Sequence, residues 1–81
     1  MKLRDSIREL LVDARWGRGL TQEELAKRSG LSIRTISDIE RGQVLRPRAA
    51  TLRMLALGLG MDDTETRELL RMAHNSMIID R

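Results

Sequence analysis

Hydrophobic residues recur at helical spacing along the whole chain, and no segment shows the strict alternation of a half-buried strand. Near the N-terminus one helical face collects Leu3, Ile7, Leu10, Leu11 and Ala14. Gly17 and Gly19 follow, and glycine accepts the left-handed conformation that commonly ends a helix. We therefore predict a first helix that ends between residues 15 and 18.

Two helix-start signals stand close together in the next segment. Thr21 followed three residues later by Glu24 predicts a capping box, and Ser32 predicts a second N-cap. Only residues 29–31 separate the two predicted helices, and Gly30 can take the positive φ of a sharp turn. The segment therefore predicts two short helices that meet at an angle.

The C-terminal half predicts two more helices. A fourth begins near residues 49–51, after Pro47 has blocked continuation of the third, and Gly58 and Gly60 are expected to end it. A fifth begins within Asp62–Asp63, where acidic side chains complement the helix dipole. Their core-facing positions are Leu52, Leu55, Ala56, Leu59, Leu69, Leu70, Met72 and Ala73.

The composition suits one folded domain. The chain has 81 residues, of which 41% are hydrophobic and 33% charged, and no apolar run approaches the roughly 20 residues of a membrane span. Cysteine is absent, which suits a reducing cytoplasm. Phe and Tyr are absent too, so Leu, Ile, Met and Ala have to build the core, with Trp16 as a further candidate.

Metal binding and catalysis find no support in the sequence. His74 is the only histidine, so a metal site is not expected, and nothing places Ser, Asp and His as a triad. We therefore expect no enzyme activity, no metal and no cofactor. The methionines are expected to fill the core or an interface: Met54, Met61, Met72 and Met77.

Positive charge is concentrated in the N-terminal part. Residues 1–48 carry eleven basic and seven acidic side chains, whereas residues 49–81 carry four and five. The segment "RGQVLRPR", residues 41–48, holds three arginines and no acid. Such a segment favours a polyanionic partner, although a solvated loop is the plain alternative.

The third predicted helix has two unlike faces. Ile36 and Ile39 lie on one side, where they can pack on the domain, whereas Arg34 and Asp38 point the other way without an obvious partner. The segment "GLTQEELAKRSGLSIRTISDIERG" around it resembles the XRE/Cro-type, lambda-repressor-like DNA-binding domain. The matching positions are Gln22, Ala26, Gly30, Leu31, Ser32, Ile36, Ser37, Ile39, Glu40 and Gly42.

The resemblance extends over about residues 3–73 and implies a fold and a mode of binding. The fold is all-α, a compact five-helix lambda-repressor-like bundle in which helices 2 and 3 form a helix-turn-helix. The third helix, about residues 32–41, is then the recognition helix that enters the major groove of double-stranded DNA.

The resemblance also implies residue roles. The base-facing positions are Ser32, Ile33, Arg34, Ser37 and Asp38. Arg34 could donate two hydrogen bonds to a guanine and Ile33 could pack on a thymine methyl, while Asp38 either accepts from a cytosine or holds Arg34 in position. The backbone-facing positions are Gln22, Thr35, Arg41, Arg46 and Arg48, the last near or in the minor groove. Arg15 and Glu40 would form a bidentate pair that ties the recognition helix to the scaffold.

These inferences predict a cytoplasmic, nucleoid-associated transcriptional regulator, such as a repressor. It would bind a two-fold operator as a homodimer, with no membrane or metal partner. Apolar residues left over from the core are the interface candidates: Leu57, Met61, Met77, Ile78 and Ile79. The DNA-binding domain is expected to span residues 1–73, and residues 74–81 to form a tail that either dimerises or is disordered. The alternative is a protein-interaction module on the same fold, an antitoxin or an adaptor.

Overall fold

The computed structural model describes residues 7–44 and 46–79, with the side chains of the last helix described as far as residue 74. The described residues form five helices and no strand, which confirms the predicted all-α fold. The helices are α1 (Ile7–Gly17), α2 (Gln22–Ser29), α3 (Ile33–Glu40), α4 (Ala49–Leu59) and α5 (Asp63–Ile79). None of them is long and apolar enough to cross a bilayer.

The helix starts follow the local signals in the sequence. The Thr21 hydroxyl accepts a hydrogen bond from the Glu24 N–H at 3.0 Å, and the Glu24 carboxylate accepts one from the Thr21 N–H at 2.9 Å, which completes the predicted capping box. The Ser32 hydroxyl caps α3 by accepting a hydrogen bond from the Thr35 N–H at 3.0 Å. Gly30 ends α2 with a φ of 80°, a left-handed conformation that permits the sharp turn between α2 and α3.

One glycine has a different role from the one predicted. Gly58 does not end α4 but lies buried inside it, and Gly60, with a φ of 79°, is the C-cap. A Cβ atom on Gly58 would lie 2.8 Å from the Cβ and 2.9 Å from the backbone nitrogen of Ser29 in α2. The expectation that Gly58 stops α4 is therefore wrong, because its missing side chain serves the close approach of α2 and α4.

The core is built from aliphatic side chains of all five helices. Its buried members are Ile7, Leu11, Leu25, Ala26, Ile36, Ile39, Leu52, Leu55, Ala56, Leu59, Leu69 and Ala73. Trp16 is not among them, since it is 71% exposed at the end of α1. The expectation of Trp16 as a core residue is corrected accordingly. Leu3 lies outside the described residues.

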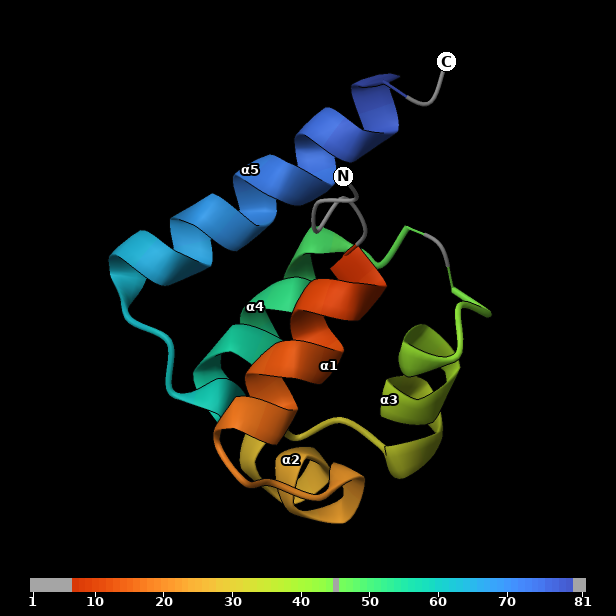
Figure 1. Ribbon diagram of the computed structural model, residues 1–81, viewed down its shortest axis with the longest axis vertical. Helices are drawn as coiled ribbons and strands as arrows, with labels where there is room; N and C mark the ends of the chain where they lie inside the picture. Colours follow the sequence, from red (N-terminus) through yellow and green to blue (C-terminus); the bar gives the residue numbers. More distant parts are fainter. Residues whose placement is uncertain (1–6, 45, 80–81) are drawn as a thin grey trace.

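The arrangement leaves α3 at one side of the molecule (Figure 1). Helix α3 packs against α1 and α2, whereas α4 packs against α2 and α5. Figure 1 shows α5 along the opposite side from α3. Residues 74–79, part of the tail expected from the sequence, continue α5. Helix α3 therefore packs on the domain through one face and is exposed on the other.

Candidate nucleic-acid interface

Helix α3 separates its side chains into a buried and an open face. Ile36 and Ile39 are buried in the core, whereas Ile33 is exposed and the Arg34 side chain is 88% exposed. Ser37 and Asp38 are half-buried on the same side of the helix. The structure thus brings the predicted base-facing residues together on one surface, which we call the α3 face: Ser32, Ile33, Arg34, Ser37 and Asp38.

The hydroxyl groups of Ser32 and Thr35, at the start of α3, contact each other. The Ser32 hydroxyl accepts from the Thr35 N–H at 3.0 Å and lies 2.9 Å from the Thr35 hydroxyl. The Ser32 hydroxyl therefore acts as the N-cap of α3, and these bonds hold it in place. Thr35 is half-buried beside it.

The family-implied pair at the base of α3 is present in the structure. The Arg15 guanidinium donates from Nε to Oε2 of Glu40 at 2.7 Å and from Nη2 to Oε1 at 2.8 Å. Arg15 Nη1 also donates to the Leu20 carbonyl at 2.8 Å. The two side chains are only 12% and 8% exposed. Because both oxygens of Glu40 are held, the C-terminal end of α3 is fastened to α1 at a defined orientation.

A third side chain joins this pair. Gln22, at the start of α2, donates from Nε2 to Oε1 of Glu40 at 2.9 Å. Burial alone would raise the pKa of the Glu40 carboxyl, but the bonds from Arg15 and Gln22 and the charge of Arg15 together outweigh it and lower that pKa. The bond to Glu40 raises the pKa of Arg15. Glu40 is thus the ionised centre of a network that links α1, α2 and α3, a role for Gln22 that sequence reasoning missed.

Two further arginines make contacts that the sequence pattern does not reveal. Arg18 donates to the carbonyl groups of Leu59, at the end of α4, and Ala14, near the end of α1. Arg8 donates to the Glu40 carbonyl at 3.4 Å. Both side chains therefore satisfy carbonyl groups at helix ends, where a cation also complements the helix dipole.

The connection from α3 to α4 carries the remaining backbone-facing candidates. Arg41 is the C-cap residue of α3 and Arg48 the N-cap residue of α4, and both are exposed, as is Arg46. Pro47, between the last two, is buried. Within the described part of this connection, residues 41–44 and 46–48, the three arginines are therefore at the surface, and Pro47 is buried near the start of α4.

The residues predicted for a dimer interface differ in their exposure. Leu57 on α4 is 75% exposed, whereas Met61 is half-buried and packs against the core. The side chains of Met77, Ile78 and Ile79 lie outside the described part of the structure. Leu57 is therefore the exposed candidate for an interface among the described side chains.

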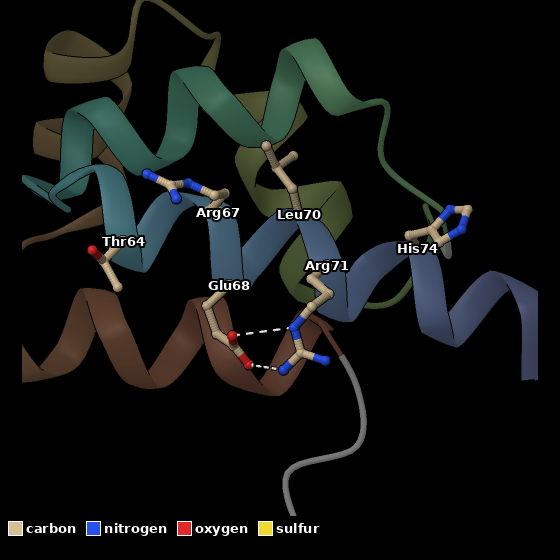
Figure 2. A pocket seen from close by; sticks show the side chains of 6 residues that line it. All are labelled: Thr64, Arg67, Glu68, Leu70, Arg71 and His74. Carbon is tan, nitrogen blue, oxygen red and sulfur yellow. Dashed lines mark hydrogen bonds and ion pairs between the residues drawn. The ribbon is translucent and has the colours of Figure 1, made fainter.

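The outer surface of α5 has an open depression, seen in Figure 2. Thr64, Arg67, Leu70 and His74 line it with an ion pair between Glu68 and Arg71. The side chains point in different directions in Figure 2 rather than converging on one point. The described residues also contain no group of three or more His, Cys, Asp or Glu side chains placed to hold a metal ion.

Comparison with models of known families adds an independent observation. Residues 7–69, most of the chain, match a family described as a helix-turn-helix domain. No significant match was found among curated proteins or solved structures. The matched range starts with α1 and ends within α5, so it includes both short helices and the turn between them.

Proposed function

The chain belongs to the helix-turn-helix domain family, and from this premise we propose that it is a sequence-specific DNA-binding transcriptional regulator of the XRE/Cro type. In this role α3 enters the major groove of double-stranded DNA, which is about 12 Å wide and admits one helix. The protein recognises DNA without catalysing a reaction on it.

The carrying observation is the contrast between the two faces of α3. One face packs into the core through Ile36 and Ile39, and the end of the helix is held by the partly buried Glu40. The α3 face is left exposed and presents an arginine with a hydrophobic neighbour, Ile33. An exposed isoleucine next to a guanidinium suits a base-pair edge, because thymine offers a methyl group and guanine two acceptors.

We assign the phosphate contacts to groups around α3. The N-terminus of α2 adjoins the end of α3, where Gln22 bonds Glu40, and helix N-termini favour anions. The Thr35 hydroxyl lies in the first turn of α3. Arg46 and Arg48, both exposed, supply cationic charge from the following segment, and we assign Arg48 to a narrow minor groove. These contacts give orientation and affinity but little sequence discrimination.

A dimer supplies the remaining specificity. One recognition helix reads few base pairs, and two-fold dimers of such domains place their half-sites about one DNA turn, roughly 34–36 Å, apart. The exposed Leu57 on α4 supports this part of the proposal, because an isolated leucine of that exposure gains from burial in an interface.

The test is fluorescence anisotropy of a labelled random-sequence duplex over a series of salt concentrations. The proposal expects binding at low salt and a steep loss of affinity with increasing salt, since each phosphate contact releases counterions. Selection of bound sequences from a random library should then return an inverted repeat. Absence of any DNA binding at low salt would refute the proposed function and favour the protein-interaction module.

A further inference from the structure

Asp38, on the α3 face, pairs with two arginines, Arg34 and Arg41. Its Oδ1 accepts a hydrogen bond from Nη2 of Arg41 at 3.3 Å, whereas Nε of Arg34 lies 3.7 Å from Oδ2, beyond hydrogen-bond range. Asp38 is 26% exposed and Arg34 is 88% exposed. Arg41 is therefore the closer partner of the carboxylate, and Arg34 remains the more accessible guanidinium.

From these distances we propose that Arg41 is a positioning residue, which neutralises Asp38 and thereby leaves Arg34 available to a base edge. The proposal rests on the DNA-binding function proposed above and specifies how the α3 face performs it. It replaces the phosphate contact that the family resemblance implied for Arg41 with a contact inside the protein.

Electrostatics explains why the α3 face needs such a residue. A carboxylate carried into the major groove without a cationic partner is repelled by the phosphates on both sides. Asp38 is also four residues after Arg34, the spacing at which opposite charges on one helix attract each other. An unneutralised Asp38 would thus weaken DNA binding and also hold the Arg34 fork away from guanine.

Arg41 is well placed to satisfy Asp38 instead. It is three residues further along and forms the C-cap of α3, where the negative end of the helix dipole also stabilises a cation. The Asp38 carbonyl meanwhile accepts from the Gln43 N–H at 2.8 Å, which holds the chain after Arg41 against the end of α3. The local backbone therefore keeps Arg41 near the carboxylate.

A double-mutant cycle tests the inference. We would measure the affinity of wild-type protein, Arg41→Ala, Asp38→Ala and the double variant for the library-selected site and for a random duplex, by anisotropy of labelled DNA. Arg67→Ala is the matched control, since it removes an exposed arginine from α5, on the side of the molecule away from α3. Circular dichroism of each variant verifies that the helices are intact.

The expected result is that Arg41→Ala weakens binding to the selected site about tenfold and reduces preference over random DNA. In the Asp38→Ala background, Arg41→Ala should change the affinity for the selected site and the preference over random DNA by no more than about twofold each. No carboxylate is then left to neutralise. Arg67→Ala should leave the preference for the selected site unchanged.

Two results would overturn the inference while leaving the proposed function intact. One is an equal loss from Arg41→Ala in both backgrounds with a salt slope shallower by about 0.9, which identifies a direct phosphate contact. The other is no loss from Arg41→Ala in the wild-type background. A wild-type protein that binds no DNA at all would instead refute the proposed function itself.

Discussion

Arg34 and Arg46 are both exposed arginines, one on α3 and one in the connection that follows it, yet their removal should have different consequences. Arg34 is proposed to read a base, so Arg34→Ala should cost about 1–3 kcal/mol on the selected site and much less on random DNA. Competition binding with single-base variants of the site measures the difference and should locate a guanine. Equal weakening on both DNAs would contradict base contact by Arg34.

Arg46→Ala should behave differently from Arg34→Ala, because Arg46 is proposed to contact a phosphate. A phosphate contact is independent of sequence, so this variant should weaken binding to all duplexes alike and make the salt slope shallower by about 0.9. Arg34→Lys completes the comparison: it keeps the charge but lacks the planar fork, so it should restore little of the lost specificity. A lysine that restores full discrimination would argue against a bidentate contact.

Gly58 shows how one residue can set the distance between two helices. Helix propensity alone predicts that Gly58→Ala stabilises α4 by up to about 1 kcal/mol. The new Cβ would lie 2.8 Å from the Cβ of Ser29, however, and backbone atoms of α2 are equally close. Overpacking of this kind costs about 1–3 kcal/mol, so we expect Gly58→Ala to lower the free energy of unfolding, measured by urea denaturation.

Gly17→Ala is the matched control for that measurement. Gly17 ends α1, its φ is not positive, and a Cβ atom there would meet nothing within 4 Å. Its substitution should be neutral or stabilising by up to about 1 kcal/mol. If both substitutions gave the same stabilisation, the close approach of α2 and α4 would not depend on Gly58.

At the scale of elements, the network around Glu40 decides how α3 is held. Glu40→Ala would leave the partly buried guanidinium of Arg15 without its main partner, at a cost of about 3 kcal/mol, the lower end for a buried pair. In a domain of this size that corresponds to a fall of more than about 10 °C in Tm, measured by thermal denaturation. DNA affinity should fall as well, because α3 loses its fixed orientation.

Glu68→Ala is the control for Glu40→Ala, because it also removes one partner of an ion pair, but of an exposed one. Glu68 and Arg71 are both exposed on α5, and an exposed pair contributes little to stability. The Tm should therefore stay close to that of the wild type. A Tm for Glu40→Ala as high as that of Glu68→Ala would exclude a structural role for the Arg15–Glu40 pair.

The lowered pKa of Glu40 predicts a pH dependence with a definite sign. The carboxyl has an ordinary value near 4.5 and a lower one in the folded protein, so the folded state favours the ionised form. Its stabilising contribution is complete above the ordinary value and disappears as the pH falls through the folded value. The stability difference between wild type and Glu40→Gln, measured by urea denaturation, should therefore shrink between about pH 6 and about pH 3. A constant difference over that range would show that Glu40 has no lowered pKa.

At the scale of the whole molecule, the dimer proposal can be tested through Leu57. Leu57→Lys puts a charge at the proposed interface, so it should convert a dimer to a monomer in sedimentation equilibrium and weaken binding to the two-fold site more than to a half-site. Trp16→Lys is the control, because Trp16 is a similarly exposed apolar side chain that is not among the interface candidates. A wild-type protein that is monomeric and binds its site in a 1:1 complex would contradict the proposal.

The sequence by itself determined where the helices begin and the turn between α2 and α3. Thr21 with Glu24, Ser32 and Gly30 act within three or four residues of their partners, so a local pattern is enough to predict the helix starts and the turn. The two faces of α3 were predictable for the same reason, since the spacing of Ile36 and Ile39 decides which side is buried.

Only the tertiary structure decided what holds these helices together. Gln22 reaches Glu40, Arg18 reaches the Leu59 carbonyl, and Gly58 makes room for Ser29, all between positions far apart in the chain. The local pattern predicted a helix end at Gly58, because glycine occurs both at helix ends and where two helices approach closely. It also left Trp16 as a core candidate, although the core is filled by aliphatic side chains and Trp16 is exposed. Helix ends depend on bonds between near neighbours, whereas close packing and buried ion pairs depend on how whole helices lie against each other, which no short stretch of sequence encodes.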